Sequence, residues 1–136
     1  MDTDEVAVVG RGLTEIGLRA GGRVLIMMSG RPEHWLIHSA AVHVGATPVP
    51  LRPALSTDQL RLVARHSAAQ LLVLEGSAEL ARWRPVLPGL PSLRRIVLVG
   101  EPAPEDLSLA TVSLAYVRSA GALARRDDLG RRRSPV

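Results

Sequence analysis

Several residue types are missing from this chain of 136 residues, and each absence removes a class of function. Cysteine is absent, which excludes disulfides, cysteine-ligated zinc and thiol catalysis and is typical of a reducing cytoplasm. Lysine is absent as well, since all 17 basic residues are arginine. The chain therefore has no P-loop lysine, no Schiff-base lysine and no lysine acid–base group. Asparagine is also missing, and the joint loss of two residues with AT-rich codons indicates a GC-rich bacterial genome.

Aromatic residues and long apolar runs are also scarce. Tyr116, Trp35 and Trp83 are the only aromatic residues and phenylalanine is absent, so the core is expected to be aliphatic and little is available to stack on nucleic-acid bases. No apolar run reaches the roughly 18 residues that a membrane span needs, and the acidic start of the chain is unlike a secretory signal. We therefore expect a cytoplasmic protein with no membrane span and no nucleic-acid partner.

The chain does have enough apolar material for one small folded domain. Hydrophobic residues make up 46% of it, and a mean hydropathy of +0.15 argues against global disorder. The net charge is +4, and an excess lies from Arg118 onward, where six arginines face two aspartates. Such a tail can bind nucleic acid or an acidic partner. Because no aromatic residues are interleaved with the arginines, a solvated Arg-rich terminus is the favoured interpretation.

Helical spacing and end signals predict two helices in the first 45 residues. Apolar residues from Val6 onward recur every three or four positions and predict a helix that ends near Gly17. Pro32 suits the first position of the second helix, where no backbone donor is needed. Gly45 suits the end of that helix, because glycine adopts the left-handed conformation that stops it.

The next two helices are predicted mainly from their first residues. Ser56 followed three positions later by Gln59 forms a capping box, the clearest helix start in the chain. Ser77 is predicted to cap a short helix that Pro85 ends. Each of these helices is followed by a short apolar run, as expected if helices and strands alternate.

Short continuous apolar runs between the helices predict strands buried on both faces of a parallel sheet. The predicted strands lie at 25–28, 47–51, 71–74 and 94–99. Pro48 and Pro50 each remove a ladder donor, so their strand is predicted at an edge. The alternation predicts an α/β fold with a mostly parallel sheet and helices on both faces. Beyond Gly100 the pattern weakens, so residues 1–100 are assigned to the folded subdomain and residues 101–136 to a weakly structured linker and basic Arg-rich tail.

The segment from Val6 to Gly12 offers one candidate nucleotide site. A strand leading into Gly10-Arg11-Gly12 resembles a dinucleotide-binding turn, whose amides hold a pyrophosphate. The third small residue of that motif would be at position 15, where Glu15 would repel phosphates. The alternative is that the same residues belong to the first helix, which is the favoured interpretation.

Other polar residues are candidate metal ligands or catalytic groups. His34 and His38 stand four apart on a predicted helix, a spacing that can chelate a metal, but His43 points to the opposite face. Ordinary helix histidines are the favoured interpretation. Ser29 lies outside any Gly-x-Ser-x-Gly elbow and is interpreted as a turn residue. The pair at 127–128 is interpreted as a solvated charge patch.

A series of short motifs follows in a fixed order along the chain. They are Gly22-Arg23-Val24, Pro32-Glu33 with Trp35, Gly45-Ala46, Val49-Pro50-Leu51 and the proline-rich tract leading into a strand at 87–100. In their order and spacing, these motifs resemble the N-terminal region of the adenylate-forming (AMP-binding) acyl-CoA synthetases, and long-chain fatty acyl-CoA ligases look closest. The resemblance runs from about residue 5 to residue 99.

The resemblance implies a partial N-terminal subdomain of that fold. The family couples a carboxylate to ATP to give an acyl-adenylate, which a thiol then converts to a thioester, so ATP, Mg²⁺ and CoA serve the intact enzymes. The family's phosphate loop is rich in Ser, Thr and Gly and ends in Pro-Lys-Gly. The segment 119–121 is too short to match it. No catalytic, cofactor-binding or metal residue of the family is therefore assigned here, and no cofactor is expected in this chain.

Three hypotheses follow from the sequence. The first is a truncated or split ligase fragment that resembles a fatty acid–CoA ligase and is inactive alone. The second is a binding or regulatory module that pairs with a complementary ligase chain. The third is a nucleotide-binding α/β domain that uses Gly10 and Gly12. Self-association is also expected, because a partial sheet would leave an edge open.

Overall fold

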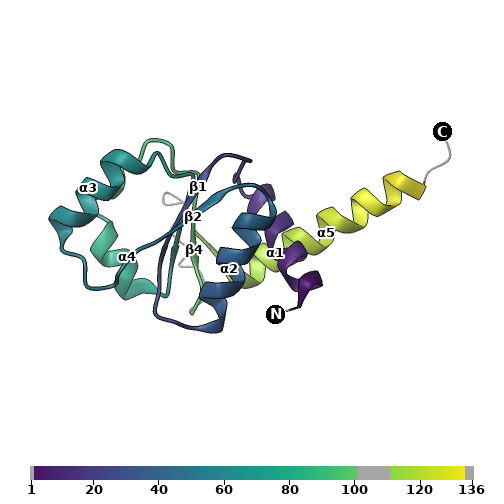
Figure 1. Ribbon diagram of the computed structural model, residues 1–136, viewed down its shortest axis with the longest axis horizontal. Coiled ribbons are helices and arrows are strands. Elements are labelled where there is room, and N and C mark those ends of the chain that lie inside the picture. Colours follow the sequence, from purple (N-terminus) through teal and green to yellow (C-terminus); the bar gives the residue numbers. More distant parts are fainter. Residues whose placement is uncertain (1, 101–110, 134–136) are drawn as a thin grey trace.

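The computed structural model describes residues 2–100 and 111–133, with side chains up to residue 130. A central sheet lies between two groups of helices, and the last helix extends away from the body (Figure 1). The elements are α1 (Thr3–Glu15), β1 (Arg23–Met27), α2 (Pro32–His43), β2 (Thr47–Pro50), α3 (Thr57–Ser67), β3 (Leu71–Leu74), α4 (Ser77–Trp83), the 3₁₀ turn η1 (Leu87–Gly89), β4 (Arg95–Leu98), β5 (Thr111–Ser113) and α5 (Leu114–Arg133).

The sheet has five parallel strands in the order β2-β1-β3-β4-β5. After β1 the chain moves outward to β2, and it then returns across β1 to add β3, β4 and β5 on the other side. This reversal places a topological switch point between β1 and β3, the position where open α/β sheets usually bind ligands. The predicted α/β class, with a parallel sheet and helices on both faces, is confirmed.

Each face of the sheet has its own hydrophobic core. Val24 and Ile26 of β1 point into the core that α1, α2 and α5 cover. Leu25 and Met27 point to the opposite side, where α3, α4 and η1 pack. All four side chains are fully buried, so the continuous apolar run is explained by burial on both faces, as in other parallel sheets.

The predicted helix ends are largely confirmed. Pro32 is the first residue of α2, and Gly45 follows its end with a left-handed φ of 81°. The capping box of α3 is complete, because Ser56 and Gln59 bond to each other's backbone N–H groups at 3.2 and 2.7 Å. The prediction for Ser77 is wrong: Gly76 occupies the N-cap position and Ser77 is already helical.

The prolines of β2 explain its place at an edge. The N–H groups of Thr47 and Leu51 donate to β1 and the residues beside it, at 2.8 Å each. Because donors alternate along a strand, the missing donors of Pro48 and Pro50 fall on the open side of β2. The predicted edge strand is confirmed, and its free side lacks two of the groups that recruit another strand.

The prediction of a weakly structured tail is wrong for residues 111–133. Thr111–Ser113 forms β5, paired with β4, and α5 packs along α1. The buried positions of α5 are Leu114, Val117, Gly121 and Ala124. The signal was weak because two of these four residues are small and Arg118 lies among them. Residues 101–110 and 134–136 lie outside the described part of the chain.

Within the described residues, no helix combines the length and apolar character of a membrane span.

Candidate functional site

The switch point of the sheet brings together residues that follow three neighbouring strands. Ser29 comes shortly after β1, Glu75 directly after β3 and Gly100 shortly after β4. Because parallel strands end at the same edge, these residues lie close together although the sequence separates them. The carboxylate of Glu75 accepts a hydrogen bond from the backbone N–H of Ser29 at 2.9 Å and another from the Ser29 hydroxyl. The N–H of Gly100 donates to the carbonyl oxygen of Glu75 at 2.6 Å.

These contacts hold Glu75 in its charged form. The Ser29 hydroxyl and then the Ser29 N–H lower the pKa of Glu75. Burial opposes them by raising it, and the charge of Arg31 contributes a smaller lowering. An ionised carboxylate that accepts two hydrogen bonds is a weak base. The arrangement therefore suits a link between two loops better than proton abstraction from Ser29.

Arg31 lies at the same edge of the sheet, beside Gly100 and Glu33. A Cβ at Gly100 would lie 3.1 Å from an Nη atom of Arg31, so glycine makes room for the guanidinium. The Nε of Arg31 also lies 3.5 Å from Glu33. With its charge shared between Glu75 and Glu33, Arg31 has little left to attract a phosphate. The N–H groups of Ser29 and Gly100 already donate to oxygen atoms of Glu75, so neither is free to bind a nucleotide phosphate in this arrangement.

The candidate dinucleotide turn lies inside α1, so the favoured helical interpretation of these residues is confirmed and the nucleotide-site alternative is wrong. A Cβ at Gly12 would lie only 2.0 Å from the carbonyl oxygen of Val117, and one at Gly10 would lie 3.0 Å from the Val44 side chain. Both glycines therefore allow α1 to approach its neighbouring helices closely. Glu15 forms an ion pair with Arg11 at 3.1 Å.

The three helix histidines do not form a common site. His34 is buried and stacks on the exposed Trp35 with ring centroids 5.2 Å apart, while His38 lies on the same ring at 6.1 Å. His43 contacts the position where a Cβ of Gly10 would lie, on the side of α2 that faces α1. In the described part of the chain, no group of three or more metal-binding residue types stands close enough to hold a metal ion.

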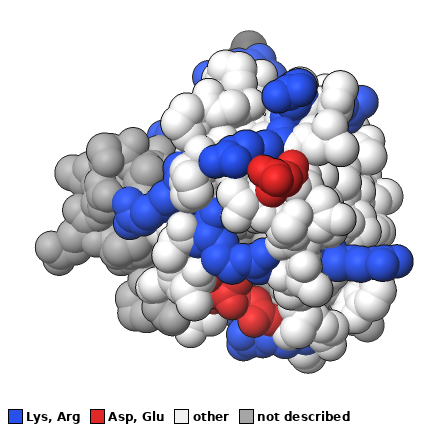
Figure 2. All heavy atoms as spheres, turned by 90° about the vertical axis from the view of Figure 1, so that its left-hand side faces the viewer, with Lys and Arg blue, Asp and Glu red and all other residues white. Residues whose placement is uncertain are grey.

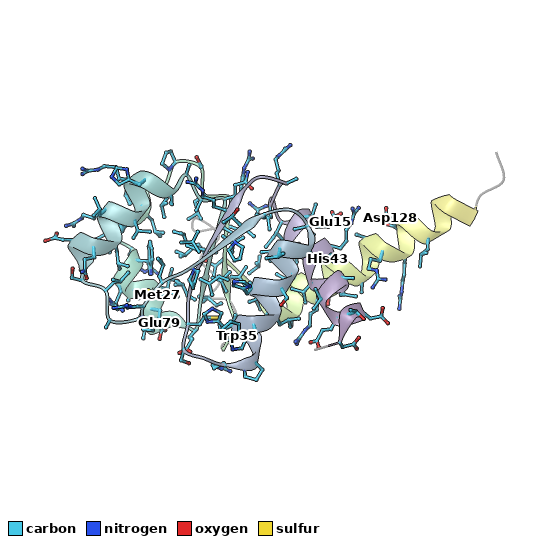
Figure 3. The ribbon with its side chains drawn as sticks, viewed as in Figure 1. Glu15, Met27, Trp35, His43, Glu79 and Asp128 are labelled. Carbon is cyan, nitrogen blue, oxygen red and sulfur yellow. The ribbon has the colours of Figure 1, made fainter. Side chains whose placement is uncertain are left out.

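Two further predictions are refined by the structure. Ser29 is a turn residue as predicted, but its bonds to Glu75 were missed. The available signal was that both residues follow predicted strands. The pair at 127–128 is not simply solvated, because Asp128 binds Arg11 at 3.4 Å. Figure 3 shows Glu15 and Asp128 at the junction of α1 and α5, where Arg11 bridges them.

Comparison with known proteins places this fold. The family model for AMP-binding enzymes matches residues 3–127. The long-chain-fatty-acid–CoA ligase FadD15 of Mycobacterium bovis is 29% identical over 122 residues, which are 90% of this chain and 20% of that protein. The 4-hydroxybenzoate–CoA/benzoate–CoA ligase of Rhodopseudomonas palustris is 30% identical over 121 residues, 89% of this chain and 22% of that protein.

The fold is shared with solved ligase structures. The crystal structure of the anthranilate CoA ligase AuaEII superposes with a TM-score of 0.76 at 24% identity, covering 85% of this chain and 22% of the ligase. The chain thus spans about one fifth of the length of the curated relatives it matches. Because the family model covers nearly the whole sequence, the chain belongs to the AMP-binding enzyme family.

Proposed function

We propose that this chain serves as the N-terminal segment of an adenylate-forming acyl-CoA ligase. The residues that catalyse adenylation would then lie in polypeptide outside these 136 residues. The observation that supports this most directly is the family match over residues 3–127 in a chain without lysine. Transfer of the adenylyl group of ATP to a carboxylate, with release of pyrophosphate, needs charge neutralisation by lysine, Mg²⁺ or oriented amides. The edge around Glu75 offers an anion and amides that are already bonded.

The proposed acyl substrate of the assembled enzyme is a fatty acid. This extends the name of the matched mycobacterial relative, a long-chain-fatty-acid–CoA ligase. A benzoate-type ligase matches at similar identity, so aromatic acids are the alternative substrate class. ATP, Mg²⁺ and CoA would be bound by the remaining parts of the enzyme, and we place the protein in the cytoplasm.

A second candidate function is a binding module that associates with a ligase chain without taking part in catalysis. It is favoured by the two complete hydrophobic cores, one on each face of the sheet. A segment with its own cores can fold before it meets a partner. The two proposals differ in whether binding restores activity.

An assay of ATP–pyrophosphate exchange distinguishes the ligase-segment proposal from the binding-module proposal. The chain alone is expected to give no exchange with ATP and either palmitate or benzoate. It is then mixed with a related ligase from which the matching N-terminal fifth has been deleted. Restored exchange with palmitate supports the first proposal, and binding without exchange supports the module. Exchange by the chain alone, above that of a boiled sample, contradicts both.

A further inference from the structure

The described surface is unevenly charged. Residues 51–100 hold seven arginines but only three carboxylates, so the positive charge is not confined to the tail. Figure 2 views the molecule from the side of α3 and α4 and shows arginine side chains across this face with few acidic ones between them. The seven arginines of residues 51–100 are Arg52, Arg61, Arg65, Arg82, Arg84, Arg94 and Arg95.

Arg61 and Arg65 are engaged less by the rest of the protein than Arg82 and Arg95 are. Arg82 is held by the carbonyl oxygens of two loop residues, and Arg95 bonds the carbonyl of Arg94 at 2.9 Å. Arg61 has only an ion pair with Asp58 at 3.3 Å, with both side chains more than half exposed, which makes the pair weak. Arg65 has no ion pair or hydrogen bond to any described residue.

Arg61 and Arg65 border a cavity between α3 and the segment that follows α4. Its volume is about 400 Å³, within the range of small-molecule sites. The opposite wall consists of Pro85, Val86, Gly89 and Pro91. Ala64 and Val86 are buried and form apolar lining. A Cβ at Gly89 would lie 3.9 Å from that of Ala64, so the two walls of the cavity approach each other at this end.

The lining combines two cations with an apolar surface. Arg61 and Arg65 stand four residues apart, so their guanidinium groups project from the same side of α3. Guanidinium groups bind carboxylates and phosphates through paired, charge-assisted hydrogen bonds. The remaining lining residues carry no charge and can cover a hydrocarbon group.

We propose that this cavity binds an anionic amphiphile, a carboxylate or phosphate attached to an apolar chain. Nucleic acid fits less well, because no aromatic residue lines the cavity to stack on a base. The proposal does not depend on the proposed function, since the cavity lies on the α3 side and away from the Ser29–Glu75 edge.

Nuclear magnetic resonance titration of the ¹⁵N-labelled chain tests this site. Monomeric decanoate is expected to shift the amides of Ala64, Arg65, Val86 and Gly89 until they saturate. Decanol, which has the same chain without the charge, is expected to bind about tenfold more weakly, as for the loss of one charge-assisted hydrogen bond. Hexyl phosphate is expected to shift the same amides as decanoate.

Matched pairs of variants distinguish binding in the cavity from nonspecific attraction to the net positive charge of the chain. Arg61→Gln with Arg65→Gln should weaken decanoate binding about tenfold or more. Arg52→Gln with Arg95→Gln removes the same charge from residues that do not line the cavity and should change binding less than about twofold. Retained spectral dispersion in each variant shows that the fold is intact.

Several outcomes overturn the proposal. Equal affinity for decanoate and decanol would show apolar contact only. Equal weakening by the two pairs of variants would show attraction to net charge. Binding to phosphatidylglycerol vesicles without any shift by monomeric decanoate would assign the basic face to a membrane surface instead of to a single amphiphile.

Discussion

Ser29 and Glu75 connect two loops that the chain reaches 46 residues apart. The bond ties the turn after β1 to the turn after β3, across the switch point of the sheet. In an enzyme domain this edge faces the substrate, and a fixed carboxylate there sets the sign of the local potential. Glu75 therefore both stabilises the edge and discourages phosphate binding at this edge.

The lowered pKa of Glu75 gives a pH-dependent prediction. Because the folded state holds the carboxylate in its charged form, the stabilisation is present above the ordinary glutamate pKa of about 4.3 and is lost as pH falls through the lower folded value. Glu75→Gln should reduce the free energy of unfolding by roughly 1 kcal/mol at pH 7, given the exposure of the bond. The difference from the parent chain should shrink as the pH falls below the ordinary glutamate pKa of about 4.3.

Urea unfolding at a series of pH values measures this difference. Ser29→Ala serves as the second variant, because it removes the hydroxyl donor and keeps the carboxylate. It should also lose less stability on acidification than the parent chain. Parallel stability curves for the parent and Glu75→Gln would mean that the Ser29 contact contributes nothing to the acid response.

The helices α1 and α5 cross with almost no side chain between them. A Cβ at Gly121 would lie 1.9 Å from the carbonyl oxygen of Val8, and one at Gly12 would lie 2.0 Å from that of Val117. Ion pairs flank the crossing, with Arg118 bound to Glu5 at 2.9 Å. The Gly-x-Gly of α1 is thus used for helix contact, where a backbone must come near another backbone.

The crossing gives a prediction with an internal control. Gly121→Ala should lower the free energy of unfolding by about 2 kcal/mol, because overpacking against a backbone oxygen forces the helices apart. Gly130→Ala makes the same substitution in the same helix with nothing within 4 Å of the new Cβ. It should raise stability by roughly 0.5–1 kcal/mol through helix propensity. Urea midpoints measure both, and equal effects at the two positions would contradict close packing at the crossing.

The elements that the sequence predicted are those with strong local signals. Such signals depend on only a few neighbouring residues. Examples are the capping box at Ser56, the proline that begins α2 and the unbroken apolar runs of the strands. The helix α5 was missed because its contact face uses Gly121 and Ala124, which carry little hydrophobic signal. The Ser29–Glu75 contact was missed because it depends on strand order, which no local pattern specifies.

The two edge strands of the described sheet, β2 and β5, differ in how readily they can pair with a strand of another molecule. At the β2 end, Pro48 and Pro50 remove the donors that would face a neighbour, so another strand finds few groups to pair with. At the other end of the described sheet, β5 is paired only with β4. The expected self-association of this chain, if it occurs, is therefore predicted to avoid the β2 edge.

Restoring backbone N–H donors at positions 48 and 50 should allow the β2 edge to pair with a strand of another molecule. Pro48→Val with Pro50→Val supplies two outward N–H groups on a strand whose residues favour β structure. We expect a higher apparent mass for this variant than for the parent chain in light scattering after size exclusion, growing with protein concentration. Pro53→Val makes the same chemical change in the turn after β2 and should leave the mass at the parent value. If all three proteins scatter alike, the prolines have no role in keeping the β2 edge from pairing.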